Sequence, residues 1–412
     1  MPAIVARFNP FTTPETRRLA VLFGVVYFAQ GMWSLPNQTI TMIFKDTGMS
    51  AGQVATFFVI STTPWLLKPV YGLLSDFVPL FGRRRTGYFV LGSGLAALAG
   101  FGVAFGGSAS YWALVTLVTA MGLGLAFTDV MTDALMVENG RPRGLTGAFQ
   151  SVQWAAIYGA AVLVGVGGGY LAEHRNLTAT FLVAACFPLV SLVMALRFID
   201  EPPARADWNA LREQARAVRA ALASREVWLV AGFIFFWTFS PSFGPAFVFY
   251  QVDDLKFSQQ FIGTLTALGS LGSVAGAAVY APLSRLMSLR RIINLSIGLG
   301  MLGTLIYLLY RGPVSGILID ITYGFLYMLT TLAFLDLAAK ACPRHVEGTF
   351  FALLMSVFNL GQQGSQWTGG HLYDYVGFRN LVLIASAMTA LTWLLVPLIN
   401  IDRIEASARK AA

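Results

Sequence analysis

Three ionisable side chains, Lys68, Asp129 and Asp133, fall inside long apolar segments of the sequence. A charge at the middle of a membrane-spanning helix costs about 2.5–3.5 kcal/mol on the insertion scale, so such a residue is a functional candidate. Asp129 and Asp133 are four residues apart and therefore share one face of a helix. This acidic pair and Lys68 could exchange a proton for an ion pair, because burial favours the neutral carboxylic acid. The alternative is a structural network of ion pairs that seals one end of the protein.

Amide and aromatic side chains form a second candidate group near the middle of several apolar segments. Amides donate and accept hydrogen bonds, and aromatic rings stack on flat ligands. Four amides fall within eight residues at 359–366, a clustering that favours the lining of a polar cavity over hydrogen bonds between helices. The residues expected to contact a small-molecule substrate are Gln30, Asn37, Gln150, Gln153, Trp154, Trp237, Asn359, Gln363 and Trp367.

Composition decides what kind of protein carries these groups. The 412 residues are 56% hydrophobic and 12% charged, whereas soluble domains are about 45–50% apolar and about 25% charged. A soluble enzyme and a disordered protein are therefore excluded, and two cysteines, Cys186 and Cys342, cannot form a disulfide framework. His174, His345 and His371 fall at the ends of apolar segments or in loops, and no nucleophile and base are paired at a useful spacing. We expect no enzyme activity, no cofactor and no metal site.

The spacing of charges predicts an all-α integral membrane protein with twelve membrane-spanning helices. A spanning helix needs roughly 20 mainly apolar residues. The window 86–128 is long enough for two helices joined by a turn at 106–108. The stretch 312–335 is interrupted only by Asp320, which lies shallow from the outer side, where solvent could reach it. The windows free of Asp, Glu, Lys and Arg are 19–44, 47–67, 86–128, 144–172, 176–196, 227–252, 257–284, 292–310, 348–373 and 380–401.

Lys and Arg residues are distributed unevenly over the predicted loops. With the N-terminus inside, 23 of the 28 lie on the inner side, and inner loops of membrane proteins are enriched in Lys and Arg. We therefore place both termini in the cytoplasm and interpret the net charge of +8 as a consequence of topology, not of nucleic-acid binding. The five on the outer side are Lys45, Arg175, Lys256, Arg311 and Arg379.

The chain divides into two weakly similar halves. Segment 1–18 is a cytoplasmic N-terminal segment, 19–197 and 227–401 are six-helix bundles, and 402–412 is a cytoplasmic tail. The linker 198–226 alternates Ala and Leu with Arg and Glu, which indicates a short amphipathic helix that lies on anionic lipid or is simply solvated. Two pseudo-symmetric bundles joined by a cytoplasmic loop resemble the major facilitator superfamily, and the resemblance implies that fold.

The loop after the second predicted helix carries a Gly, an Asp and a basic cluster, and resembles the loop between spans 2 and 3 of that superfamily. Asp76 can accept hydrogen bonds from amides at a helix N-terminus, and the arginines can reach carboxylates or helix C-termini. Such contacts form only when the cytoplasmic side is closed, so the loop predicts a cytoplasmic gate; simple anchoring of positive charge is the alternative. The expected gate residues are Gly72, Asp76, Arg83, Arg84, Arg85, Glu138, Arg344 and Glu347.

Three longer strings resemble the folate–biopterin transporter family. They are PWLLKPVYGLLSDFVPLFGRRR at 64–85, DVMTDALMVE at 129–138 and ACPRHVEGTFFALLMSVFN at 341–359. The counterpart of the first string in the second half, at 281–285, has no acidic residue, which departs from a symmetric pair of gates. The resemblance covers most of the chain and implies a folate- or pterin-like substrate, whose donor and acceptor edge the amides could bind.

We therefore expect a secondary active transporter that moves such a solute by alternating access, coupled to protons or exchanging solutes. Two alternatives remain open: a transporter of another metabolite such as S-adenosylmethionine, and a non-transporting membrane scaffold or assembly factor. The complete loop at 72–85 and the amide-rich segment favour transport, because a scaffold needs no gate. We expect a monomer in the cell membrane (inner or plasma), whose partners are the solute, protons and lipids, with no nucleic acid.

Overall fold

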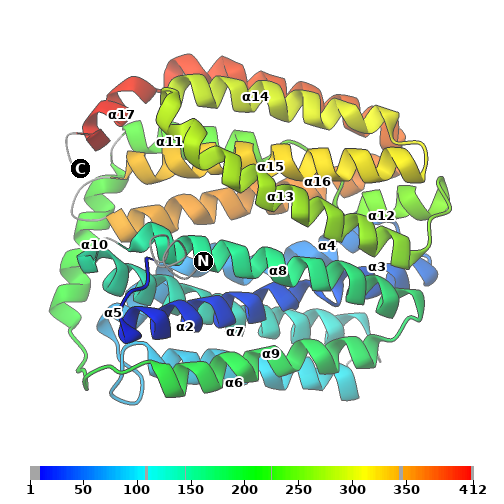
Figure 1. Ribbon diagram of the computed structural model, residues 1–412. Helices are drawn as coiled ribbons and strands as arrows, with labels where there is room; N and C mark the ends of the chain where they lie inside the picture. The colour runs from blue at the N-terminus through cyan, green and yellow to red at the C-terminus, as the bar shows by residue number, and fades with distance from the viewer. Residues whose placement is uncertain (1–9, 107–109, 144, 224, 343–346, 410–412) are drawn as a thin grey trace, which may run out of the picture. The chain divides into compact units, whose positions relative to one another are not determined.

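The computed structural model describes residues 10–106, 110–143, 145–223, 225–342 and 347–409. Within these ranges the regular structure is helical, and an isolated β-bridge joins Leu80 to Arg83. Figure 1 colours the helices by their order along the chain, from blue at the N-terminus to red at the C-terminus. The helices, with 3₁₀ turns marked η, are α2 (Pro14–Gly31), η1 (Met32–Ser34), α3 (Asn37–Asp46), α4 (Ala51–Thr62), η2 (Thr63–Leu67), α5 (Lys68–Phe77), α6 (Thr86–Phe105), α7 (Tyr111–Gly140), η4 (Arg141–Arg143), α8 (Thr146–Glu173), α9 (Leu177–Phe198), α10 (Trp208–Leu222), α11 (Arg225–Thr238), α12 (Gly244–Asp253), α13 (Gln259–Leu286), α14 (Leu289–Leu305), η5 (Ile306–Leu309), α15 (Pro313–Ala341), α16 (Glu347–Leu391), η6 (Thr392–Leu398) and α17 (Ile401–Arg409).

Ten helical segments among the described residues are long and apolar enough to cross a membrane, judged by length and composition. The difference from the expected twelve has two causes. The stretch from α11 to α12 is divided into helices of 14 and 10 residues, each shorter than the roughly 20 residues that a span needs. In α16, Gly377 has a φ of 73° and a ψ of 174°, which interrupts the helix inside the single long segment Phe350–Leu398. The number twelve therefore stays a prediction.

Prolines interrupt three of the expected spans. Pro36 precedes α3, Pro64 lies in η2, and Pro241 lies between α11 and α12. Proline has no backbone N–H and disfavours helical geometry at the preceding residue, so carbonyls one turn earlier lose their helical partner. In a membrane those carbonyls need other donors. At the second break, Gln363 Nε2 donates a hydrogen bond to Thr62 O at 2.9 Å.

The helices group into two compact units. One boundary between the units falls at Pro36, the proline break before α3, and another falls at Pro69, in the first turn of α5. The first unit contains Met1–Pro36, Val70–Val164 and Leu177–Trp208, and the second contains Asn37–Pro69, Gly165–Asn176 and Asn209–Ala412. The second unit therefore combines parts of the first half of the sequence with the whole second half.

Each unit has its own hydrophobic core. In the first unit the buried ring of Phe23 meets Phe149 edge-on, with ring centroids 5.0 Å apart. In the second unit Phe233 and Phe334 pack together, with ring centroids 5.4 Å apart. Large apolar side chains also cover helix surfaces, and Leu98 is 74% exposed. Exposed apolar faces of this kind suit helices that contact lipid tails.

Candidate functional site

A tight turn brings the chain back toward the end of α5. Leu80 and Arg83 exchange two backbone hydrogen bonds of 3.0 and 2.9 Å, and Phe81 and Gly82 between them have φ values of 54° and 71°. Positive φ at both central residues is the geometry of a type I′ turn, for which glycine at the second position is well suited. The turn places Arg85, at the start of α6, beside the last turn of α5.

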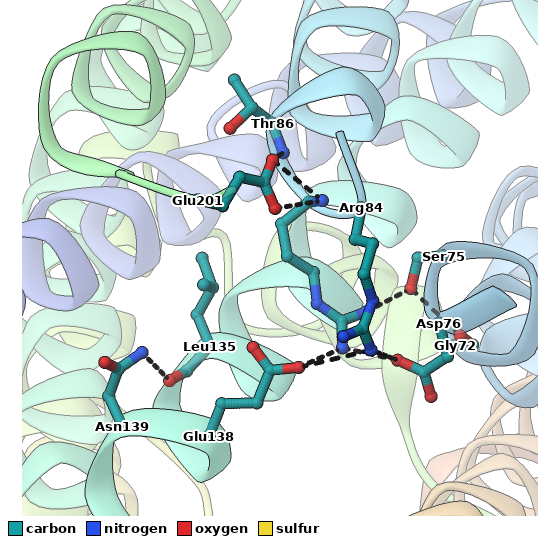
Figure 2. Close-up of polar contacts among 10 residues, drawn as sticks. Gly72, Ser75, Asp76, Arg84, Thr86, Leu135, Glu138, Asn139 and Glu201 are labelled. Atoms are coloured by element: carbon teal, nitrogen blue, oxygen red, sulfur yellow. Dashed lines mark hydrogen bonds and ion pairs between the residues drawn. The ribbon is translucent and has the colours of Figure 1, made fainter. Parts of the chain in front are cut away.

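Arg85 lies at the centre of an ion-pair cluster whose surroundings are drawn in Figure 2. Only 3% of Arg85 is exposed. Its Nη2 lies 2.5 Å from both Asp76 Oδ1 and Glu138 Oε1, and its Nη1 donates to Ser75 Oγ at 2.5 Å. Arg84 Nη2 is farther away, 3.5 Å from Asp76 Oδ1 and 3.9 Å from Glu138 Oε1. These five residues, called the Arg85 cluster below, join the ends of α5 and α7 to the start of α6.

The charge of Arg85 depends on its two carboxylate partners. Burial of the guanidinium lowers the pKa of Arg85, but the charges of Asp76 and Glu138 together outweigh burial and raise that pKa above its usual value. Arg85 is therefore charged throughout the physiological pH range. A buried charge that loses a partner is costly, so both carboxylates are needed to keep Arg85 in place.

Glu201 caps the N-terminus of α6 from the linker that follows α9. Its Oε2 accepts a hydrogen bond from Arg85 N at 2.9 Å, and its Oε1 accepts one from Thr86 N at 2.7 Å. A carboxylate here satisfies amides that lack helical partners and is favoured by the helix dipole. Ala204 N also donates to Gly82 O at 2.8 Å, so the linker lies against the turn. The sequence analysis missed Glu201, because one acidic residue in a linker carries no signal of the helix it caps.

The acidic pair of α7 faces α2. The hydroxyl of Tyr27 in α2 donates a hydrogen bond to Asp133 Oδ1 and also interacts with Asp129. Asp129 is buried, with 2% of its surface exposed. Lys68, the first residue of α5, belongs to the second unit, and the acidic pair belongs to the first. The proposed exchange between Lys68 and the acidic pair therefore stays a prediction.

Polar contacts within the second unit join segments from the two halves of the sequence. Lys45 Nζ of α3 lies 2.6 Å from Asp253 Oδ1 at the end of α12. Asp374 of α16 accepts hydrogen bonds from Ser50 Oγ at 2.6 Å and from Gly52 N at 3.0 Å, at the start of α4. All five residues lie in or beside loops that the charge distribution places outside. They are called the outer clasp below.

A close helix contact accompanies the outer clasp. A methyl group added to Gly263 of α13 would lie 2.1 Å from Gly165 O of α8, so this approach requires glycine at position 263. At the start of α13, Gln259 N donates a hydrogen bond of 2.6 Å to Glu173 Oε2, at the end of α8. Small residues are the usual means by which membrane helices approach closely. The second unit is thus held by backbone packing as well as by charge.

Three predicted substrate residues of α16 contact the second predicted span. Gln363 Nε2 donates to Thr62 O at 2.9 Å, and Asn359 Nδ2 lies 3.5 Å from Trp65 O, its acceptor. Trp367 is 45% exposed, and its indole N–H bonds to α4. In this conformation these donors are therefore engaged by the backbone or side chains of the neighbouring span.

A cavity of about 120 Å³, called the Trp237 cavity below, lies inside the second unit, bordered by α11, α14, α15, α16 and the break between α11 and α12. Trp237 lines it and stacks on Phe334, with ring centroids 4.1 Å apart. The volume is below the 300–1,000 Å³ typical of small-molecule sites, so the cavity accepts only a small group in this conformation. Its polar lining includes Thr238, Ser240, Thr304, Tyr327, Gln362 and Thr389.

Two predicted substrate amides of the first unit have unmet hydrogen-bonding capacity. Gln153 is 1% exposed, and no residue that the structure describes accepts a hydrogen bond from its Nε2. Likewise, no residue that the structure describes donates a hydrogen bond to Gln30 Oε1, which is also buried. Buried polar atoms normally have partners, so a bare donor and a bare acceptor point to a ligand or water.

Sequence comparison relates this chain to a known family. Residues 28–410 match the BT1 family. The chain belongs to the BT1 family. It is 32% identical to the folate-biopterin transporter of Synechocystis sp. over 94% of this chain and 82% of that protein. It is also 25% identical to folate transporter 2 of Plasmodium falciparum, over 93% of this chain and 89% of that protein. The family predicted from three sequence strings is confirmed.

Solved structures of transporters resemble this BT1 family chain in fold. A D-xylose–proton symporter has a TM-score of 0.69 and 14% identity, over 92% of this chain and 95% of that one. A nucleoside transporter has a TM-score of 0.71 and 11% identity, over 94% of this chain and 99% of that one. The chain is thus a multi-pass integral membrane protein with the all-helical fold of such transporters. The orientation of its termini stays a prediction.

The remaining predicted site residues of the BT1 family chain belong to several different elements. Trp154 stacks on Tyr158, with ring centroids 6.1 Å apart, Gln150 is exposed, and Asn37 is the first residue of α3. Arg83 is exposed and holds the turn through its backbone. Their roles stay predictions.

Two further gate predictions differ in what the structure describes. A methyl group on Gly72 would lie 3.8 Å from Val130 Cγ1, an ordinary contact, so no close helix approach depends on Gly72 in this conformation. Arg344 lies outside the described residues, and Glu347 is the first residue of α16.

Proposed function

We propose that the protein is a secondary transporter that moves a folate- or pterin-like solute across the membrane by alternating access. The names of its relatives in Synechocystis and Plasmodium supply the solute class. Its likeness to a D-xylose–proton symporter supports a transporter fold and shows nothing about this chain's solute. Proton coupling is part of the proposal and rests on the carboxylates buried within the helices.

The observation that carries the proposal is the outer clasp. It joins Lys45, Ser50 and Gly52, from the first half of the sequence, to Asp253 and Asp374 from the second half. A transporter needs a barrier on one side that opens when the other closes. The clasp holds one ion pair, of a kind that contributes about 0–1 kcal/mol near the surface, and two hydrogen bonds to Asp374, so it can break in a transport cycle. The clasp has the composition of a reversible barrier on the outer side.

The Arg85 cluster is the proposed inner gate. Its charges occupy the end of α7, where the carboxylate of Glu138 is 43% exposed and can be released from Arg85 when the helices move. Glu201 couples the linker to the same point of α6. A change at the inner gate therefore acts on the segment that connects the halves of the sequence.

The topology belongs to the same proposal. We propose twelve spans in two bundles, 19–197 and 227–401, with both termini and the linker 198–226 in the cytoplasm. Single cysteines at Ser108 and Ala215 in a variant without Cys186 and Cys342 test it. An impermeant maleimide added to intact cells should label position 108 and should not label position 215 until the cells are opened. The reverse pattern would contradict the orientation.

The residues proposed to contact the solute are Gln30 and Gln153 in the first unit and, in the second unit, Trp237 with Asn359 and Gln363 of α16. A pterin presents donors and acceptors along one edge and a flat ring, which suit amides and an indole. A ligand screen by thermal denaturation of the purified protein tests the solute class. Ligand at 100 times its Kd stabilises by about 2.7 kcal/mol. Folic acid or a pterin should raise the Tm; a rise with S-adenosylmethionine alone, or with no compound, would contradict the proposal.

A further inference from the structure

Asp320 lies within the membrane-spanning helix α15 and is enclosed by tyrosines. The sequence analysis expects it to be open to solvent, but it is half-buried. Tyr307 OH donates to its Oδ1 at 3.2 Å, and Tyr310 OH donates to its Oδ2 at 2.9 Å. Both tyrosines are at most 4% exposed. The carboxyl therefore sits in an aromatic environment with one phenol on each oxygen.

Within the described part of the chain, no Lys, Arg or His forms an ion pair with Asp320. The other aspartate of α15, Asp336, is different, because Lys340 Nζ lies 2.7 Å from its Oδ2. A carboxylate inside a membrane helix that has phenols but no cation is expensive to keep charged. Uptake of a proton removes that cost.

The groups around Asp320 are polar but uncharged on every element that packs against it. Besides Tyr307 and Tyr310, α12 contributes Gln251, whose Nε2 donates to Tyr310 OH at 2.9 Å, and Tyr250, whose hydroxyl donates to Tyr310 O at 2.9 Å. From α13 the approach is made by the backbone of Gly269.

The remaining groups are farther out. Tyr323, one turn along α15, interacts electrostatically with Asp320. The charges of Asp254 and Arg311 act on Tyr250, not directly on the carboxyl.

A row of tyrosines leads from Asp320 to the Trp237 cavity. Tyr307 meets Tyr323 edge-on, with ring centroids 5.0 Å apart, and Tyr323 and Tyr327 follow each other along α15. Gln362 Nε2 donates to Tyr327 OH at 3.2 Å. Tyr323, Tyr327 and Gln362 all line the cavity. Packed side chains therefore connect Asp320 to the cavity wall.

We propose that Asp320 is a proton-binding site that links proton uptake to the state of the Trp237 cavity. This inference rests on the proposed transport function. A proton from the outer solution adds to a lone pair of Oδ1 and forms an O–H bond, and no group leaves. Tyr310 keeps its hydrogen bond to Oδ2. The Tyr310 hydroxyl oxygen accepts from Gln251 Nε2, which leaves the hydroxyl hydrogen directed toward Oδ2. The protonated Oδ1 is a weaker acceptor, so its hydrogen bond from Tyr307 weakens, and this change acts on the packing of Tyr307 against Tyr323.

Transport by the purified protein in proteoliposomes tests the coupling, with folic acid as the probe. Asp320→Asn keeps the size of the side chain and one acceptor oxygen near the phenols, puts an NH2 donor in place of the other oxygen, and cannot carry the proton. It should retain exchange of labelled for unlabelled folic acid and lose the accumulation that a pH gradient drives in the wild type. Asp254→Asn, the same change at an exposed aspartate, should retain both. Gradient-driven accumulation in Asp320→Asn equal to the wild type would overturn the proposal.

A measurement without transport separates this inference from the proposed function. Infrared difference spectra between acidic and alkaline samples should show C=O bands of protonated carboxylic acids, and Asp320→Asn should lose the component that Asp320 contributes. Tyr307→Phe removes a donor that favours the charged form, so the band should appear at higher pH than in the wild type. Unchanged spectra in both variants would overturn the proton site, even if folic acid is transported. If wild-type protein does not exchange folic acid, the solute is wrong and the infrared result still decides Asp320.

Discussion

Arg85 Nη2 and Glu138 Oε1 lie 2.5 Å apart, although 53 residues separate them in the sequence. The same guanidinium nitrogen also contacts Asp76 Oδ1. One buried cation thus holds two carboxylates that come from the ends of α5 and α7. Because the Arg85 guanidinium is always charged, a substitution that removes one carboxylate leaves the other as the main partner that balances its charge.

Glu138→Gln should destabilise the protein. Arg85 stays buried with one anion fewer; an unsatisfied buried group costs about 1–3 kcal/mol, and more when it is charged. The Tm of the purified protein measures the loss. The matched control is Glu15→Gln, which breaks the exposed Arg143–Glu15 pair, where Glu15 is 63% exposed. That change should cost about 0–1 kcal/mol. Equal losses in the two variants would mean that the Arg85 cluster is no more than surface charge.

Gly263→Ala should open the outer side. The added methyl group would meet Gly165 O at 2.1 Å, so α8 and α13 must separate. Overpacking costs about 1–3 kcal/mol. If that cost falls on the closed state, the open state becomes about fivefold or more populated, and the labelling rate rises by the same factor. The measurement is labelling of Thr56→Cys by an impermeant maleimide in a variant without the native cysteines. Gly159→Ala is the control, because a methyl group there meets no atom within 4 Å among the described residues. Labelling that is equally slow in both variants would count against the clasp as a barrier.

Local patterns of the sequence predicted the parts of the gate that lie within one string. Gly72 to Arg85 form one continuous segment, the end of α5 and the turn after it, so Asp76 and Arg85 could be proposed together, and the turn at 80–83 places them in contact. One contact was unexpected: Asp76 binds Arg84 and Arg85 rather than the amides of a helix N-terminus. Those amides at α6 are taken by Glu201 instead.

The outer clasp could not be predicted from the sequence. Lys45 and Asp253 are separated by more than half the chain, and each taken alone has the appearance of an ordinary loop charge. The same limit applies to Asp320, whose shallow position in the sequence suggests solvent. Its enclosure depends on Tyr307 and Tyr310, which come from the end of a different helix segment.

Gln153→Leu should weaken solute binding without lowering the stability of the ligand-free protein. Gln153 Nε2 has no partner among the described residues, so an apolar replacement removes an unsatisfied group. The Tm with and without folic acid measures both quantities. Gln363→Leu is the contrast, because it removes a hydrogen bond to Thr62 O and should lower the ligand-free Tm. A lower ligand-free Tm in Gln153→Leu, with an unchanged response to folic acid, would assign Gln153 to helix packing.

Asp129→Asn should retain substrate exchange and lose accumulation driven by a pH gradient. Asp129 is 2% exposed beside Tyr27, and asparagine resembles the protonated acid at that position. Uptake by proteoliposomes with and without a pH gradient measures the difference. Full gradient-driven accumulation in this variant would leave Asp129 a structural partner of α2 and would place coupling elsewhere, with Asp320 as the remaining candidate.

Folic acid counterflow in proteoliposomes tests the central proposal most directly. Purified protein is reconstituted with unlabelled folic acid inside, and labelled folic acid is added outside at a low concentration. A carrier that works by alternating access should bring about a transient accumulation of label that excess unlabelled pterin abolishes and that protein-free vesicles lack. A scaffold, or a carrier of an unrelated metabolite, would give the label content of the protein-free vesicles, and that result would contradict the proposed function.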